Sequence, residues 1–244
     1  MPRADTGRHL TRALKHRIYR LFFGGQSVSL VGTWITRVAT SWLVYRLTGS
    51  ELLLGIVSFC GQIPTLVLTP FAGVVVDRGD RRKILLWTQI LSLVQSAALA
   101  VLTLTDVITV TQILVLQLVQ GVINAFDTPA RQALVVEMVE NRDDVPNAIA
   151  LNSSMVNGSR IIGPSIGGLI IAGVGEGWCF ALDALSYVAV VISIILMRIK
   201  PRARAPHVAP MLDDLQTGWR YVVESAPIRS VLILLAIIST ASMP

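Results

Sequence analysis

Residues 73–83 read Gly73-Val-Val-Val-Asp77-Arg78-Gly-Asp-Arg81-Arg82-Lys83, a short charged stretch between two long apolar runs. Four cations and two carboxylates fall within the seven residues from Asp77 to Lys83. The flanking runs, Leu52–Val76 and Ile84–Thr105, hold 25 and 22 residues and contain no charged side chain. A membrane-spanning helix needs about 20 apolar residues. The stretch is therefore predicted to be a turn between two membrane helices, and its cations place it on the cytoplasmic face.

The composition is that of a membrane protein, with 53% hydrophobic and 15% charged residues. A soluble domain would carry about 25% charged residues. The net charge of +6 does not indicate a nucleic-acid partner, because the cations lie in short segments between apolar runs. Cys60 and Cys179 show neither metal-ligand spacing nor a disulfide pattern. The sequence thus predicts no cofactor, no metal site and no enzyme.

Six apolar runs qualify as membrane spans, and each is expected to be helical because a helix satisfies its backbone polar groups without water. The runs are 21–45, 52–76, 84–105, 107–126, 150–175 and 178–197. The predicted fold is therefore an all-α integral membrane protein with a six-helix bundle at 21–197. A basic cytoplasmic segment (1–20) precedes it. A linker with an amphipathic helix (198–227) and the start of a seventh helix (228–244) follow.

The distribution of lysine and arginine predicts the orientation of the bundle. One side of the bundle collects almost all of them, while the opposite side has only Arg46. Both ends of the six-helix unit are therefore expected in the cytoplasm. The residues on the cytoplasmic side are Arg3, Arg8, Arg12, Lys15, Arg17, Arg20, Arg78, Arg81, Arg82, Lys83, Arg131, Arg142, Arg198, Lys200, Arg202, Arg204, Arg220 and Arg229.

Prolines suggest where two cytoplasmic elements begin. Thr128-Pro129 resembles an N-cap followed by proline at the first helical position, which predicts a short surface helix at 130–140. Pro146 similarly opens the fifth span. At the C-terminal end, the apolar residues 230–244 reach only about 22 Å as a helix, whereas the hydrocarbon core is about 30 Å thick. We interpret them as a seventh span cut short, with a C-terminal six-helix half missing; the alternative is a complete six-helix protein with a re-entrant tail.

Two motifs resemble those of one transporter superfamily. The pattern Gly73-x-x-x-Asp77-Arg78-x-x-Arg81-Arg82 after a second span resembles the signature loop of the major facilitator superfamily, although that family has glycine where this chain has Asp80. In the fifth span, Gly163-Pro164-Ser-Ile-Gly167-Gly168, with Ser159 at the preceding small-residue position, resembles the superfamily's antiporter motif. Residues 125–132 and 146–153 further resemble the branch that contains the bacterial enterobactin exporter and macrolide efflux proteins.

The resemblance implies a fold, a function and a location. The chain would be the N-terminal half of a twelve-helix bundle in the bacterial inner membrane. It would export a small organic molecule, such as a drug or a siderophore, by alternating access, with proton coupling expected from the family. The alternatives are a non-transporting membrane fragment or scaffold and the membrane domain of an ATP-driven transporter. The last would need long cytoplasmic helical extensions, and the sequence contains no Walker A pattern.

The resemblance also implies a conformational latch in the charged turn. In the family this aspartate is thought to hold the two halves together through a positive helix N-terminus. Asp127, at the end of the fourth span, is expected to pair with Arg81. The alternative is that the cations only fix topology and contact lipid headgroups. The candidate latch residues are Gly73, Asp77, Arg78, Arg81, Arg82 and Asp127.

Charged groups inside spans are functional candidates because burying them in a membrane is costly. Arg37 is expected either to meet an anionic or catecholic substrate or to form a buried pair. Arg160 lies in the middle of the fifth span. Asp183 is the carboxylate deepest in a span, and we expect it to pair with an arginine or a polar neighbour rather than to carry protons. Gln117 stands where many proton-coupled relatives have arginine.

Overall fold

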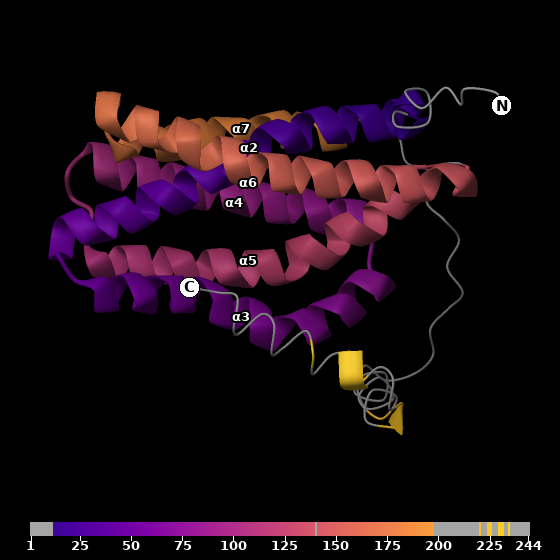
Figure 1. The fold of residues 1–244 in the computed structure, drawn as a ribbon, viewed down its shortest axis with the longest axis horizontal. Coiled ribbons are helices and arrows are strands. Elements are labelled where there is room, and N and C mark those ends of the chain that lie inside the picture. The colour runs from indigo at the N-terminus through magenta and orange to yellow at the C-terminus, as the bar shows by residue number, and fades with distance from the viewer. Residues whose placement is uncertain are drawn as a thin grey trace. The chain divides into compact units, whose positions relative to one another are not determined.

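The computed structural model describes residues 12–139 and 141–197, together with residues 220, 224, 225, 229–231 and 234. The chain divides into two units, Met1–Pro201 and Arg202–Pro244. The basic positions before residue 12, and most of the expected linker and seventh helix, lie outside the described residues. Figure 1 shows the helices of the first unit, which are η1 (Arg12–Lys15), α2 (Arg17–Thr48), α3 (Glu51–Arg78), α4 (Arg81–Leu104), α5 (Val110–Glu137), η2 (Arg142–Asp144), α6 (Val145–Val174) and α7 (Glu176–Leu196).

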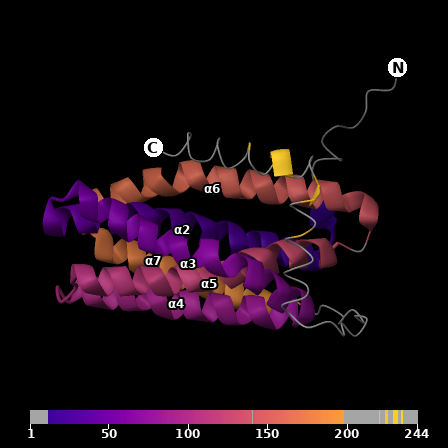
Figure 2. The same cartoon turned by 90° about the horizontal axis from the view of Figure 1, so that it is seen from below.

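The described residues form a helical membrane bundle and include no strand. Within them, α3, α4, α5 and α7 are long and apolar enough to cross a membrane. Helices α2 and α6 are more polar, but they run alongside the other four in both views (Figures 1 and 2). Their 32 and 30 residues extend over about 48 and 45 Å at 1.5 Å per residue, which is longer than the hydrocarbon core is thick. The count of six spans stays a prediction.

The helices pack in the order α6–α2–α7–α4–α5–α3 rather than in chain order. Helix α3 packs mainly on α5, and α6 packs mainly on α2. The pattern is unchanged when α2 is exchanged with α5, α3 with α6 and α4 with α7. Two inverted three-helix repeats would produce this exchange symmetry.

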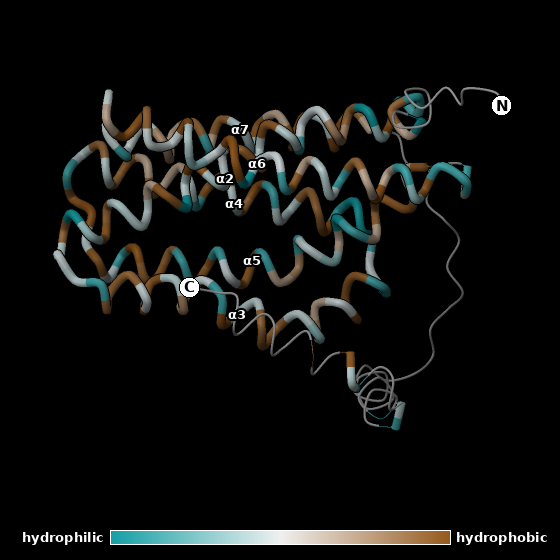
Figure 3. The backbone as a smooth tube through the Cα atoms, viewed as in Figure 1, coloured by the Kyte–Doolittle hydropathy of each residue, from teal (hydrophilic) through white to brown (hydrophobic). Residues whose placement is uncertain are grey.

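The outer faces of the bundle are apolar. Leu66 of α3 and Leu169 of α6 are 78% and 76% exposed, and α3 is only 6% buried along its most apolar stretch. Figure 3 shows apolar positions along the full length of the helices, with hydrophilic ones at both ends of the bundle and at some places between. A hydrocarbon environment accounts for this distribution, because it removes the cost of exposing leucine to water.

The interior consists of two apolar clusters with polar side chains between them. One cluster surrounds Tyr19 and Phe22 near the α3–α4 turn, and the other surrounds Leu43 and Phe180 toward the opposite end. The positions between the clusters on α2, α4 and α7 are buried and polar. We call them the polar layer: Gln26, Ser29, Thr88, Gln89, Ser92, Gln95, Ser96, Asp183 and Ser186. Hydrogen bonds between such side chains help to hold membrane helices together, because helices that already lie in lipid have no hydrophobic driving force to associate.

The predicted separate helix at 130–140 is wrong, because α5 continues through Pro129 to Glu137. The proline removes one backbone hydrogen bond, but the apolar face beyond it is buried. Ala130 and Leu134 are 0% and 1% exposed within the first apolar cluster. Thr128 is therefore inside a helix and not an N-cap. The expectation for Pro146 agrees with the structure, since α6 begins at Val145 with this proline in its first turn.

Candidate functional site

The charged turn between α3 and α4 is closed by a helix cap. Helix α3 ends at Arg78, and α4 begins at Arg81 after Gly79 and Asp80. The Asp80 carboxylate accepts hydrogen bonds from the backbone N–H groups of Arg82 (3.1 Å) and Lys83 (3.2 Å). An aspartate N-cap satisfies backbone donors that no residue within the helix can reach. The departure from the superfamily's glycine at this position thus provides a side-chain cap for α4.

Arg81 connects the turn to the end of α5. Its Nη2 donates to Asp77 Oδ1 at 3.0 Å, and its Nη1 donates to Glu137 Oε1 at 2.9 Å. The Arg81 side chain is 21% exposed, whereas that of Asp77 is 72% exposed. The expected pairing of Arg81 with Asp127 is wrong. Glu137 takes that place because it lies ten residues beyond Asp127, about 15 Å further along the helix and level with the turn.

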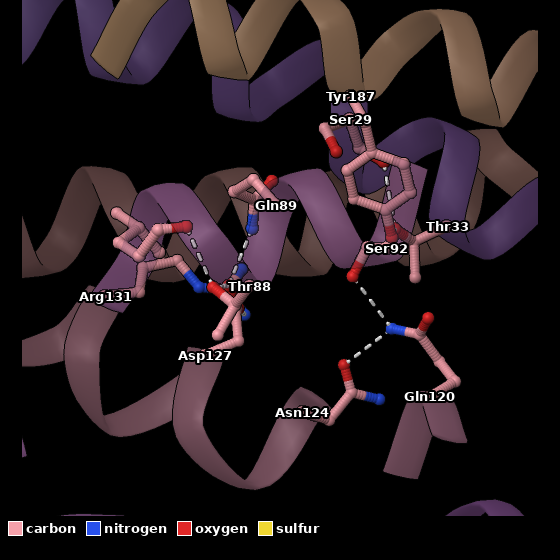
Figure 4. Close-up of polar contacts among 11 residues, drawn as sticks. Ser29, Thr33, Thr88, Gln89, Ser92, Gln120, Asn124, Asp127, Arg131 and Tyr187 are labelled. Carbon is pink, nitrogen blue, oxygen red and sulfur yellow. Dashed lines mark hydrogen bonds and ion pairs between the residues drawn. The ribbon is translucent and has the colours of Figure 1, made fainter. Parts of the chain in front are cut away.

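Asp127 organises a separate buried cluster between α5 and α4 (Figure 4). Its carboxylate pairs with Arg131, one turn later on α5, at 2.9 Å. It also accepts hydrogen bonds from Thr88 Oγ1 (2.9 Å) and Gln89 Nε2 (2.6 Å) of α4. The Asp127 side chain is 8% exposed and that of Arg131 is 18% exposed. This arrangement compensates a buried charge with one cation and two neutral donors, and it holds α5 against α4.

Arg82 binds the C-terminal end of α7. Its guanidinium donates to the carbonyl oxygens of Ile194 (3.0 and 3.1 Å) and Ile195 (3.1 Å). The last carbonyls of a helix have no partner within that helix and carry partial negative charge, so a cation there is stabilising. The two arginines of the turn therefore connect it to α5 and α7. Of the other candidate latch residues, Arg78 is exposed, and Gly73 has open space where a Cβ would stand.

The antiporter-like residues of α6 pack against α2. A Cβ on Gly163 would collide with Trp34 and would stand 3.0 Å from the carbonyl oxygen of Val31. Gly167 faces Ile35 of α2 in ordinary van der Waals contact, whereas Gly168 has open space around it. Pro164 lies inside α6, and the buried Ser159 hydroxyl donates to the Met155 carbonyl at 2.8 Å. The two inward glycines thus permit the close approach of the first and fifth predicted spans.

Asp183 lies among hydroxyl groups in the polar layer. Its Oδ2 accepts hydrogen bonds from Thr36 of α2 and Ser96 of α4, both at 2.9 Å, and its side chain faces Gly32 of α2. The residue is 2% exposed, and no arginine pairs with it among the described residues. Of the two expected partners, the polar neighbour is the one that the structure shows. Gln117 lies elsewhere, against Gly61 of α3.

Arg37 and Arg160 converge on one aromatic ring. The guanidinium carbon of Arg37 lies 4.5 Å from the centre of the Trp34 ring, and that of Arg160 lies 5.2 Å from it. Arginine over a tryptophan face is a favourable cation–π contact. The structure therefore brings together two residues that the sequence singled out separately. It adds Trp34, which the sequence analysis did not single out.

Comparison with known protein families matches residues 11–243 to the transmembrane secretion effector family of the major facilitator superfamily. The chain belongs to this family. The match covers nearly the whole chain, and it agrees with the superfamily that the charged turn and the fifth-span motif resemble. The helical bundle is accordingly that of a multi-pass membrane protein of the efflux branch.

Several relatives of this chain are named as transport proteins. It is 29% identical to the staphyloferrin A transporter of Staphylococcus aureus over 74% of this chain and 46% of that protein. It is 26% identical to macrolide efflux protein A of Streptococcus pyogenes over 76% of this chain and 45% of that protein. It is 25% identical to the enterobactin exporter EntS of Shigella boydii over 93% of this chain and 54% of that protein. The chain spans about half the length of the relatives it matches.

Sequence reasoning missed the polar layer of this family member and the polar side chains that form hydrogen bonds near it. Gln120 of α5 donates to Ser92 of α4 (3.2 Å) and to Asn124 (3.0 Å), while Thr33 and Tyr187 share a hydrogen bond of 3.3 Å between α2 and α7 (Figure 4). A signal was present in the third span, where polar residues recur at helical spacing within an uncharged run. It was missed because only charged residues were counted. Glu176 was missed for a different reason: it lies between the spans predicted at 150–175 and 178–197, yet the structure buries it and pairs it with Arg46.

Proposed function

We propose that this chain forms the first six-span half of a secondary exporter of small organic molecules. The observation that carries this proposal is the family match together with the charged turn, whose two arginines are fixed on α5 and α7. The relatives that the chain matches are named for siderophores and macrolides, which supports substrates of that size. The whole protein would lie in the bacterial inner membrane with its N-terminus in the cytoplasm, as the distribution of cations predicts.

The turn supports alternating access because it exposes the carboxylate of Asp77 while Arg81 and Arg82 attach the turn to α5 and α7. Arg81 holds Asp77 at one end, yet the Asp77 side chain is 72% exposed and remains open to a further contact. A carboxylate in this position is suited to the positive N-terminus of a helix in the second half. In our proposal this contact closes the cytoplasmic side in the outward-facing state. Asp127 then positions α4 and α5 from within and does not touch the second half.

We further propose that export is coupled to protons and that Asp183 carries the proton. It is a buried carboxylate in the α7 span, held by hydroxyls rather than by a cation, and its Oδ1 has no hydrogen-bond partner. A carboxylate without a counter-charge in a membrane interior is a functional candidate, because burying a charged group there is costly. The sequence predicts a structural role for Asp183. In the part of the chain that the structure describes no arginine pairs with it, which favours the coupling role instead.

An efflux assay on the full reading frame that contains this chain tests the proposal. Cells that express Asp77→Asn should retain a macrolide or a siderophore at least tenfold longer than wild type, because the latch contact is lost while the helices still insert. Asp80→Asn, which keeps the α4 cap, serves as the matched control and should export normally. Membrane levels are measured by immunoblot for every variant.

Three results would count against the proposal. Normal efflux by Asp77→Asn would remove the latch from the mechanism. Efflux that persists after a protonophore collapses the proton gradient would remove proton coupling. Failure of the wild-type protein to export any macrolide or siderophore in the panel, at confirmed membrane levels, would remove export of these compounds altogether.

A further inference from the structure

Two arginines from different helices share one tryptophan near the middle of the bundle. Arg37 follows Trp34 by one turn on α2, and Arg160 reaches the same ring from α6, where Gly163 lets the helices meet. With distances of 4.5 and 5.2 Å to the ring centre, the two guanidinium carbons are within about 10 Å of each other, and like charges that close repel in a medium of low dielectric constant.

Neither arginine has an acidic partner among the described residues. The ion pairs of this part of the chain use other cations, such as Arg46 with Glu176 and Arg131 with Asp127. Asp183, the carboxylate deepest in the neighbouring helix, is held by hydroxyl groups. Charged groups inside a membrane protein are expected to be paired or to mark a ligand pathway. Two cations side by side without an acidic partner in this part of the chain therefore mark a candidate binding site for one anion.

The arginines lie on a polar face, which lipid would not cover. On α6, the exposed residues Ser153, Asn157 and Arg160 follow one another at spacings of four and three and so share a helix face. On α2, Ser41 is exposed one turn beyond Arg37 and donates to its carbonyl at 3.1 Å. Such a face suits a water-filled pathway or a protein partner.

The position along the helix excludes a lipid headgroup as the natural anion. Arg160 follows Val145 by fifteen residues and precedes the end of α6 at Val174 by fourteen, which is about 21 Å from either end. The anion must therefore enter along the polar face as a dissolved small molecule. A guanidinium binds carboxylates and other oxyanions through two parallel N–H donors, and contact with Trp34 restricts the orientation of both guanidinium groups.

We propose that Arg37, Trp34 and Arg160 form an anion-binding site, and that the exporter's substrate class is small organic oxyanions, of which an aromatic carboxylate is the simplest. The inference rests on the proposed function and narrows it. It distinguishes a carboxylate or catecholate substrate from the amine-bearing cations that many drug exporters carry. Trp34 supplies a flat apolar surface beside the charges for the remainder of the molecule.

The test compares two dyes that share a xanthene ring system and differ in charge. The full reading frame is reconstituted into proteoliposomes, and export of the anion carboxyfluorescein is compared with export of the cation rhodamine 123. Wild type should export carboxyfluorescein at least tenfold faster than rhodamine 123. Arg37→Gln and Arg160→Gln should each lower the carboxyfluorescein rate at least tenfold. The lysine variants should fall between wild type and the glutamine variants, because lysine keeps the charge but lacks the paired N–H donors. Arg20→Gln, an exposed cation at the other end of α2, is the matched control and should change the rate less than twofold.

A competition measurement on wild type does not depend on any variant folding. Benzoate should inhibit carboxyfluorescein export, and the neutral benzamide of the same shape should not. Equal inhibition by both, or glutamine variants within twofold of wild type, would overturn the site. Export of rhodamine 123 without carboxyfluorescein would overturn the anion class and leave the exporter standing. Export of neither dye, nor of any macrolide or siderophore, would remove the proposed function, and this inference would fall with it.

Discussion

Asp127 shows how a single side chain holds two membrane helices together. Its carboxylate binds one cation from its own helix and two neutral donors from α4, and all of these groups are largely buried. A buried ion pair adds little net stability compared with apolar packing, but the loss of one partner leaves an uncompensated charge. The consequence of a substitution therefore depends on which partner is removed.

We predict that Arg131→Met lowers the free energy of unfolding by about 3 kcal/mol, because the Asp127 carboxylate stays buried without its cation. The double variant Asp127→Asn with Arg131→Met should recover at least half of that loss, since no charge is then buried. Denaturant unfolding in detergent, followed by tryptophan fluorescence, measures both.

Lys83→Met is the matched control for this cluster. The Lys83 side chain is 78% exposed and only loosely paired with Asp80, at 3.9 Å. Its removal should change the stability by no more than about 0.5 kcal/mol. A loss for Arg131→Met as small as that of the control would show that Asp127 does not depend on its ion pair.

At the scale of the element, α6 has one glycine-lined edge and one polar face. Gly163 and Gly167 face α2, whereas Ser153, Asn157 and Arg160 are exposed. The glycines allow the backbones to approach closely, which is how membrane helices gain van der Waals contact. The close approach also places Arg160 beside Trp34. The packing motif and the proposed anion site therefore depend on the same helix contact.

We predict that Gly163→Ala destabilises the bundle by about 1–3 kcal/mol, because its Cβ would overlap Trp34 and press on the backbone of Val31. Gly168→Ala, in the same motif, meets nothing within 4 Å and should be neutral or stabilising by up to about 1 kcal/mol, since alanine favours a helix. Thermal unfolding of the two variants in detergent gives the comparison. Equal effects would contradict the assignment of Gly163 to the α2 contact.

At the scale of the whole molecule, the polar and charged groups lie at distinct levels of the bundle. The ion-paired turn and the first apolar cluster occupy one end, the polar layer follows, and the second apolar cluster lies toward the Arg46–Glu176 pair. The end with more cations is expected in the cytoplasm. This orientation can be tested without reference to transport.

We predict that Val107→Cys, in the α4–α5 connection, reacts with a membrane-impermeant maleimide in intact spheroplasts. Lys83→Cys should react only after the cells are permeabilised. Both positions are exposed, and both variants are made in a background that lacks Cys60, Cys179 and any other cysteine of the full reading frame. The reverse labelling pattern would invert the assigned topology and move the charged turn outside the cell.

The sequence by itself determined that this chain is a bundle of membrane helices and which superfamily it resembles, because hydropathy, charge and short motifs are local properties of a chain. It also placed Asp77 within reach of Arg81, since the turn that joins the two predicted helices is short. It failed at Pro129 because burial of the next apolar residues, a tertiary effect, outweighed the local stop signal.

Only the tertiary structure decided which distant residues meet. Arg81 pairs with Glu137 rather than Asp127, Asp183 lies among hydroxyls, and Arg37 and Arg160 share Trp34. These contacts depend on which helices are adjacent, at what depth and with which face inward. The packing order α6–α2–α7–α4–α5–α3 decides which helices are adjacent, and the order of the helices along the chain does not reveal it.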